Sequence, residues 1–163
     1  MEIRAIREAD LSACLGIYNR YITDTTVTFE EAPLTEAEWR GRVERITGKY
    51  PYLVACEGER ILGYAYLDAY SERSAYRFTA DLSIYLDKAV TGKGIGGVLL
   101  AEIERRAAGM GIVNLLSIVT GENRASMIFH EKHGFVQVGR PERVGFKQGR
   151  WLDVVFYQKR LAD

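Results

Sequence analysis

A run of glycines placed between a strand pattern and a helix pattern constrains the fold of this chain more than any other feature. The run, Thr91-Gly92-Lys93-Gly94-Ile95-Gly96-Gly97, follows the strand-like residues 77–86 and precedes the amphipathic residues 98–110. At such a turn the backbone N–H groups point outward at the positive end of the helix, and glycine lets an anion approach them closely. The feature predicts a phosphate cradle in a protein of mixed α and β structure.

Two other phosphate-binding motifs fit these glycines less well. A Walker loop places Lys and then Ser or Thr after its last glycines, whereas Val98 follows Gly97 here. A dinucleotide fold places its glycines after the first strand, with an acidic residue about twenty positions later. This run instead follows the fourth predicted strand, and Asn114-Leu115-Leu116 lies near that offset. A flexible glycine hinge before a helix is the alternative that needs no ligand.

The remaining hydrophobic pattern predicts an α/β (α+β) fold with a mixed central sheet. Thr35 followed by Glu38 forms a capping-box pattern, which predicts a helix that Gly48 ends. Period-2 patterns and apolar runs predict strands over residues 2–6, 52–56, 61–70, 77–86, 112–119, 135–138 and 151–157, and helical spacing predicts further helices over 9–21, 98–110 and 125–133. We therefore expect about seven strands flanked by about four helices. Because the chain has no repeat or linker, residues 1–163 are expected to form a single domain.

Composition argues against several classes of partner. Lys plus Arg equals Asp plus Glu at 22 each, so no overall field favours nucleic acid or an anionic membrane. The first residues alternate charges where a secretory signal needs an apolar stretch, which predicts a cytoplasmic protein. Cys14 and Cys56 lie in apolar surroundings without a CxxC motif or a His/Cys cluster, so we expect buried free thiols and no metal site.

Two motifs resemble those of the GNAT acyltransferase family. Thr91 to Gly96 is similar to its Gln/Arg-x-x-Gly-x-Gly/Ala signature, except that Thr91 replaces the usual Gln or Arg and so removes one side-chain contact to phosphate. The motif Asn-x-x-Ala/Ser-x-x-x-Tyr/His followed by Gly-Phe is matched by Asn123, Ser126, His130, Gly134 and Phe135. Landmarks similar to the phosphinothricin N-acetyltransferase branch are Ile17-Tyr18-Asn19, Thr25-Thr26-Val27-Thr28-Phe29, Tyr76-Arg77-Phe78-Thr79, His130-Glu131, Val144-Gly145-Phe146-Lys147 and Gly149-Arg150-Trp151-Leu152-Asp153-Val154. The resemblance covers essentially the whole chain.

The resemblance implies an N-acetyltransferase domain over residues 1–163 with acetyl-CoA as cosubstrate. In this family the sheet opens beside the fourth strand, and the pantetheine arm binds there like an added strand. The residues expected to bind the cosubstrate are Ile84, Tyr85, Leu86, Gly92, Lys93, Gly94, Ile95, Gly96, Gly97, Asn123 and Lys132. Asn123 has an alternative role as the cap of the helix that begins at Ala125.

The resemblance also implies a general base. An alkylammonium is mostly protonated near neutral pH, so it must lose a proton before it attacks a thioester. The branch carries a glutamate where Asp81 stands in this chain, and Asp81 is the expected base. Because its side chain is shorter by one methylene, transfer through a water is favoured over direct transfer. The alternative is that Asp81 only pairs with Arg73 or Arg77.

His130 is the second expected catalytic residue. It stands where many relatives carry a tyrosine that protonates the departing thiolate, and an imidazole can donate a proton near neutral pH. The resemblance therefore implies that His130 acts as general acid or orients the substrate. The alternative is a helix residue that packs against Phe156 or Tyr157 and moves no proton.

The branch acetylates the primary amine of small amino-acid-like substrates such as phosphinothricin or methionine sulfoximine. The residues expected to bind the acceptor are Phe29, Arg73, Tyr76 and Arg77. Two alternatives remain: acetylation of peptide or protein N-termini, and an acyl-CoA sensor without catalysis. The apolar alternation from Trp151 to Phe156 on a terminal strand predicts a homodimer that covers an exposed edge, unless these side chains pack within one subunit.

Overall fold

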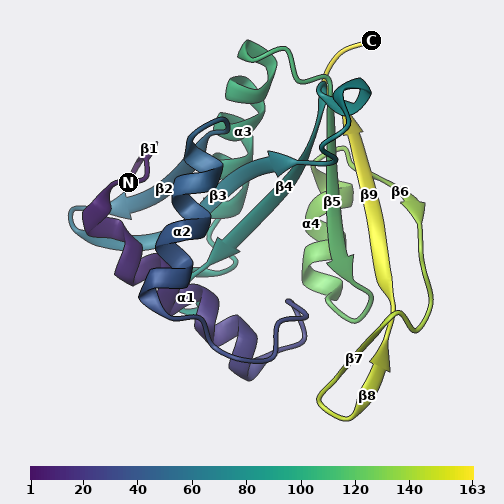
Figure 1. Cartoon of the computed structure of the whole chain (residues 1–163), viewed down its shortest axis with the longest axis horizontal. Coiled ribbons are helices and arrows are strands. Elements are labelled where there is room, and N and C mark those ends of the chain that lie inside the picture. Colours follow the sequence, from purple (N-terminus) through teal and green to yellow (C-terminus); the bar gives the residue numbers. More distant parts are fainter.

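The computed structural model describes all 163 residues and contains a mixed seven-stranded sheet (Figure 1). In order across the sheet, the strands are β1 (Glu2–Ala5), β2 (Tyr52–Glu57), β3 (Arg60–Ala69), β4 (Thr79–Leu86), β5 (Asn114–Thr120), β9 (Val154–Arg160) and β6 (Val136–Gly139). Neighbouring strands are antiparallel except β4 and β5, which are parallel. The predicted mixed sheet is confirmed.

Four helices cover the two faces of the sheet: α1 (Leu11–Asp24), α2 (Glu36–Thr47), α3 (Ile95–Gly109) and α4 (Arg124–Lys132). α1 and α2 lie side by side in front of β2 to β4, whereas α3 lies behind these strands and α4 lies near β5 and β6 (Figure 1). Short 3₁₀ turns occupy Glu8–Asp10, Ser74–Tyr76 and Lys88–Val90. None of the helices is long and apolar enough to cross a membrane.

Local capping explains where two helices begin. Thr35 Oγ1 accepts a hydrogen bond from the Glu38 N–H at 3.2 Å, and Glu38 Oε1 accepts one from the Thr35 N–H at 3.3 Å. The capping box predicted for α2 is therefore confirmed. At α4, the Asn123 Oδ1 atom accepts from the Ser126 N–H at 3.3 Å. Both caps satisfy N–H groups that the first turn of a helix leaves without a partner.

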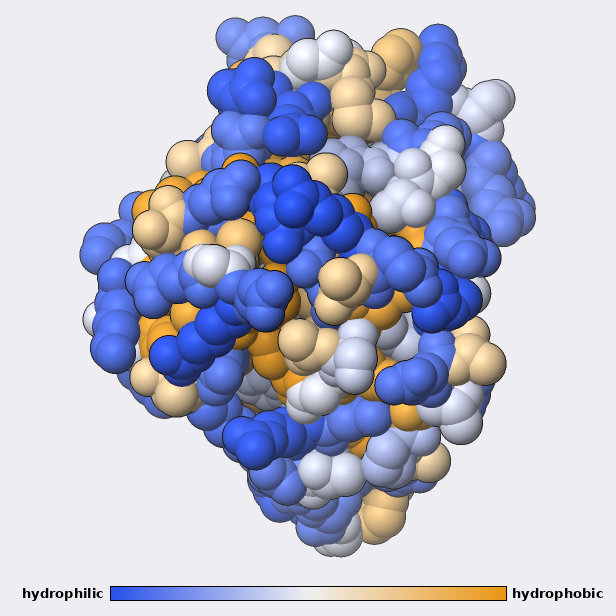
Figure 2. Space-filling model, turned by 90° about the vertical axis from the view of Figure 1, so that its left-hand side faces the viewer, coloured by the Kyte–Doolittle hydropathy of each residue, from blue (hydrophilic) through white to orange (hydrophobic).

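The core lies on both faces of β2 to β4, where the strands meet α1 and α2 on one side and α3 on the other. Cys14 and Cys56 are buried in it as free thiols, as expected. Figure 2 views the molecule from the side of β1 and the first helices. Hydrophilic groups cover most of this surface, and hydrophobic groups show mainly in the recesses between them.

The C-terminal region differs from the sequence-based expectation. Residues 151–157 do not form one strand, because β8 (Arg150–Leu152) pairs with β7 (Gly145–Lys147) in a separate two-stranded ribbon. Gln148 and Gly149 reverse the chain there with φ values of 52° and 76°, as tight hairpins require. β9 lies between β5 and β6 and is not the exposed edge strand that the apolar alternation suggested.

β4 and β5 are paired only at one end. Their register joins Thr79–Asp81 to Asn114–Leu116, and no residue of β5 pairs with residues 82–86. Figure 1 shows the two strands diverging from this short paired end. The second half of β4 therefore has no strand partner on its β5 side. Ile118 of β5 is 61% exposed because it faces this opening.

Candidate active site

A cleft of about 520 Å³ lies between the diverging parts of β4 and β5. It is lined by three groups of residues: Leu82, Ser83, Ile84, Tyr85 and Leu86 of β4; Thr91, Gly92, Gly94, Gly96 and Gly97 of the glycine run; and Ser117, Ile118, Val119, Thr120, Asn123, Ala125, Ser126, Phe129, His130, Lys132 and His133 of β5 and α4. Tyr21 and Val27 complete the wall. The structure thus brings most of the residues predicted to bind the cosubstrate into one cleft.

The glycine run forms the first turn of α3 at this cleft. The helix begins at Ile95 instead of residue 98, with Gly94 as N-cap at a φ of 83°. The first helical hydrogen bond runs from the Val98 N–H to the Gly94 carbonyl at 3.3 Å. The N–H groups of residues 95–97 consequently lack a helical acceptor and lie at the positive end of the helix dipole. This geometry can hold an anion.

Close packing against α4 explains two of these glycines. A Cβ atom at Gly96 would lie 3.2 Å from the Phe129 ring, and one at Gly97 would lie 3.1 Å from His133 Nε2. Lys93 and Ile95 are the two predicted cosubstrate residues that do not line the cleft. Lys93 is exposed, and the Ile95 side chain is buried in the core, which leaves its backbone N–H as the group available at the cradle.

Asp81 is the last β4 residue that pairs with β5, so it lies where the two strands separate. Its Oδ1 atom is buried and has no hydrogen-bond partner. Burial, and secondly the negative charge of Asp68, raise the pKa of Asp81 to about 6. Neither Arg73 nor Arg77 forms an ion pair with it; the Arg77 guanidinium donates to the Ser74 carbonyl at 3.0 Å. A carboxyl group with this pKa can accept a proton near neutral pH.

His130 is buried between β5 and α4 with both ring nitrogens engaged. Nδ1 lies 2.7 Å from the Ser126 carbonyl oxygen and Nε2 lies 2.8 Å from Ser117 Oγ. A carbonyl can only accept, so Nδ1 carries the proton, and burial lowers the pKa of the ring. The ring also stacks on Tyr157 with centroids 5.3 Å apart. The geometry favours the packing interpretation, and the general-acid role of His130 stays a prediction.

The predicted acceptor residues lie outside the main cleft, in two places. Phe29 is 37% exposed, and its ring lies against Gly145 of β7, where a Cβ atom would come within 2.3 Å of the ring. Arg73, Tyr76 and Arg77 are exposed in the connection between β3 and β4. No hydrogen bond or ring contact joins the two places within one chain.

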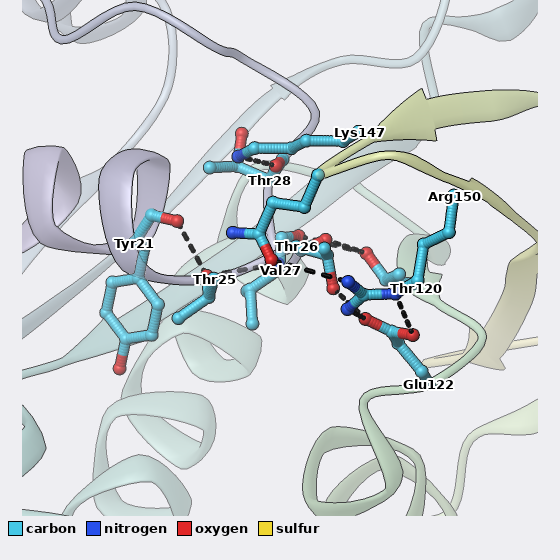
Figure 3. A network of polar contacts seen from close by, with 10 residues as sticks. Tyr21, Thr25, Thr26, Val27, Thr28, Thr120, Glu122, Lys147 and Arg150 are labelled. Carbon is cyan, nitrogen blue, oxygen red and sulfur yellow. Dashed lines mark hydrogen bonds and ion pairs between the residues drawn. The ribbon is translucent and has the colours of Figure 1, made fainter.

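Hydrogen bonds fix the segment 25–28 between α1, β5 and the β7–β8 ribbon (Figure 3). Thr120 Oγ1 donates to the Thr26 carbonyl at 2.7 Å, and the Thr26 hydroxyl donates to Glu122. The ammonium group of Lys147 is buried and donates to the Thr28 carbonyl at 2.8 Å. Arg150 holds Glu122 through two nitrogens. These partners lie far apart in the sequence, so local patterns carry no signal for them.

Comparison with known proteins assigns the chain to a family. The family described as acetyltransferase (GNAT) domain matches residues 3–156. The chain is a member of the GNAT acetyltransferase family.

Named relatives of this GNAT acetyltransferase act on amino-acid analogues. The phosphinothricin N-acetyltransferase of Alcaligenes faecalis is 40% identical, over 98% of this chain and 82% of the relative. The L-methionine sulfoximine/L-methionine sulfone acetyltransferase of Pseudomonas aeruginosa is 34% identical, over 98% of this chain and 94% of the relative. A phosphinothricin acetyltransferase of Sinorhizobium meliloti, solved in complex with AcCoA, has a TM-score of 0.95 at 39% identity, covering 99% of this chain and 88% of that one.

Several cleft residues of this GNAT acetyltransferase lie outside the sequence-based prediction. Among them are Tyr21, Val27, Ser117, Thr120 and Phe129. Ser117 alone carried a signal, because it is a polar residue within a largely apolar strand segment. The others become cleft residues only when α1, β5 and α4 meet around the opening of the sheet.

Proposed function

We propose that this GNAT acetyltransferase transfers the acetyl group of acetyl-CoA to the primary amine of a small amino-acid-like acceptor such as phosphinothricin or methionine sulfoximine, and that residues 1–163 form one N-acetyltransferase domain. One observation carries the proposal: the cleft joins the free N-terminus of α3 to the point where β4 and β5 separate, next to a buried carboxyl group. The activities named for the relatives support this acceptor class.

The lining of the cleft suits acetyl-CoA in its chemistry. The free N–H groups of residues 95–97 suit the diphosphate, and the open edge of Ile84, Tyr85 and Leu86 suits the extended pantetheine arm. Asn123 and Lys132 line the same cleft and are proposed to contact the arm or the phosphates. Asn123 also caps α4, so both of its predicted roles are compatible.

Asp81 is proposed as the base that prepares the amine. The ammonium group of the acceptor loses a proton to Asp81, directly or through a water, and the neutral nitrogen attacks the thioester carbonyl carbon. The C–N bond forms, the C–S bond breaks, and the attacking nitrogen loses its second proton. Coenzyme A leaves as the thiolate, which takes up a proton. The raised pKa of Asp81, about 6, suits this exchange near neutral pH.

The acceptor is proposed to bind on the α1 and α2 side of the opening. Arg73 and Arg77 would meet its carboxylate, and Phe29 and Tyr76 its side chain. Because Phe29 and the β3–β4 connection lie apart within one chain, the two groups would meet one acceptor across the homodimer proposed below. Phe29 belongs to the loop after α1 whose residues 25–28 are fixed by the network of Figure 3. A fixed aromatic wall of this kind suits a compact acceptor better than a peptide.

Replacement of Gly145 by Ala tests whether Phe29 contributes to the acceptor site. The added Cβ atom would lie 2.3 Å from the ring, so Phe29 must move. We expect the KM for the acceptor to rise about 10-fold, with the KM for acetyl-CoA unchanged, because Gly145 does not line the cofactor cleft. Gly16→Ala is the matched control, since its Cβ atom would meet nothing within 4 Å. An unchanged acceptor KM in Gly145→Ala would remove Phe29 from the acceptor site.

Thiol release from acetyl-CoA measures the proposed activity. The acceptor panel contains phosphinothricin, methionine sulfoximine, methionine sulfone, ordinary amino acids and a peptide with a free N-terminus. We expect turnover on the amino-acid analogues and little on the peptide. Preferred turnover of the peptide would favour a protein N-acetyltransferase, and binding of acetyl-CoA without any turnover would favour an acyl-CoA sensor.

We also propose a cytoplasmic homodimer. Large apolar residues are exposed in two neighbouring stretches of the chain: Val136 and Val138 of the edge strand β6, and Phe146 and Trp151 of the β7–β8 ribbon with Val144 just before it. Large apolar side chains exposed on an edge strand, and on the ribbon that follows it in the chain, favour an interface. Two free buried thiols suit a reducing compartment.

A further inference from the structure

A second carboxylate lies directly opposite Asp81 in the sheet. Asp68 of β3 is the register partner of Asp81 in the antiparallel pair β3–β4. Side chains of directly opposed residues point to the same face, with Cβ atoms roughly 4.5–5.5 Å apart. This face is the one that α1 and α2 cover, on the proposed acceptor side.

The two carboxylates are held very differently. Arg45 of α2 donates to both oxygens of Asp68 at 3.0 Å each, and the Ala69 N–H donates to Asp68 Oδ1 at 2.8 Å. Asp81 forms no ion pair, and its Oδ1 atom is buried without a partner. Asp68 is therefore oriented by three donors, whereas the Asp81 Oδ1 atom has none.

Few other groups act on Asp81. On β3, Tyr66 shares the face, and burial raises the pKa of its hydroxyl, so it stays neutral. β5 offers Leu116 as the register partner of Asp81, and Arg77 in the preceding loop donates to the Ser74 carbonyl. Arg45 acts from α2 through Asp68. Asp68 is thus the one charged group that contributes, after burial, to the raised pKa of Asp81.

We propose that Asp68, held by Arg45, is a positioning residue that keeps a negative charge beside Asp81 and so makes Asp81 the stronger base. The inference rests on the proposed role of Asp81 as general base. A neighbouring negative charge disfavours ionisation and raises the pKa of Asp81, while the guanidinium of Arg45 limits that effect by neutralising part of the charge. The pair would set how readily Asp81 takes the amine proton.

The two members of the pair have opposite predicted effects, which makes the test specific. The measurement is the midpoint of the acid limb of kcat/KM, taken with two acceptors whose amine pKa values differ so that the limb of the enzyme can be separated from that of the substrate. Asp68→Asn removes the negative charge, so the midpoint is expected to fall by about 0.5–1 pH unit. Arg45→Gln leaves the charge of Asp68 unbalanced, so the midpoint is expected to rise by a similar amount, about 0.5–1 pH unit.

Two further variants control this experiment. Arg42→Gln removes another arginine of α2, one that bonds Glu30 and not Asp68, and should leave the midpoint unchanged. Arg45→Lys keeps the charge and should lie between the wild type and Arg45→Gln. A loss of packing alone would lower kcat at every pH and the melting temperature without moving the midpoint. Because Arg45 is largely exposed, its variants are expected to fold even where Asp68→Asn does not.

The same variants distinguish an error in the role of Asp68 from an error in the role of Asp81. If Asp81→Asn abolishes turnover but the Asp68 and Arg45 variants leave the midpoint in place, or move it in the same direction, the positioning role is wrong and the base assignment stands. If Asp81→Asn keeps both the activity and the acid limb, Asp81 is not the base. NMR titration of the Asp81 carboxyl carbon in wild type and Arg45→Gln gives the same answer without turnover, and equal titration midpoints would overturn the inference.

Discussion

Asp81→Asn is expected to lower kcat/KM for the acceptor by about 10²-fold or more, because an amide cannot accept the amine proton. The two side chains have nearly the same shape, so the change tests proton transfer more than packing. Asp81 does not line the cofactor cleft, so the Kd for acetyl-CoA, measured by calorimetry, should not change. A loss of turnover with acetyl-CoA binding intact would identify Asp81 as part of the chemical step.

The pH dependence of kcat/KM tests the same role of Asp81. Asp81 has a raised pKa of about 6, so it is ionised and able to accept a proton above that pH. Wild-type kcat/KM should therefore fall as the pH drops through about 6, and Asp81→Asn should lack this limb. Asp81→Glu, which restores a carboxylate with a longer reach, is the rescue control. Equal activity of the Asn and Glu variants would rule out proton transfer at this position.

Gly94→Asp is expected to raise the KM for acetyl-CoA by about 10²-fold, because it places a negative charge at the helix end that would hold the diphosphate. Gly94 is the N-cap of α3, and a Cβ atom there would meet nothing within 4 Å. Asp and Asn are the non-glycine residues that best tolerate the positive φ of this position. Asp is also a favourable N-cap, so the helix should still form.

Gly94→Asn is the matched control for this change. It has the same shape and the same backbone strain as Gly94→Asp but no charge, so its KM for acetyl-CoA should stay within a few-fold of wild type. The difference between the two variants should shrink as salt is added, because screening weakens the repulsion. A similar KM for both variants at low salt would mean that the diphosphate does not lie at the start of α3.

The local features of the fold could be predicted from the sequence. The helix at Thr35 and the cap at Asn123 depend on residues within one turn of the chain, and both caps form as expected. The glycine run at residues 91–97 predicted a helix start with free N–H groups, and the start of α3 is built that way. The start of α3 was placed a few residues too late. Glycine is a poor helix former, and Gly96 and Gly97 join the helix because they pack against α4.

The C-terminal region could not be predicted to the same degree. Alternating apolar residues from Trp151 to Phe156 suit one strand, and the pattern does not reveal that β8 and β9 belong to different sheets. The turn at Gln148 and Gly149 pairs β8 with β7, and β9 then enters the main sheet beside β5. Strand pairing depends on how much surface the whole chain buries. The pattern of a short segment therefore does not indicate which strand it will pair with.

The sequence by itself determined the helix caps, the glycine cradle, the mixed α and β class and the candidate catalytic residues, because these follow from spacing between near neighbours or from a resemblance to known motifs. The tertiary structure alone decided where β4 and β5 part, that the Asp81 Oδ1 atom is buried without a partner at that point, and that Asp68 lies opposite Asp81 and is held by Arg45. It also decided that Lys147 reaches the Thr28 carbonyl. Each of these depends on strands and helices distant in the chain meeting around one core, and the resulting burial sets the pKa of Asp81.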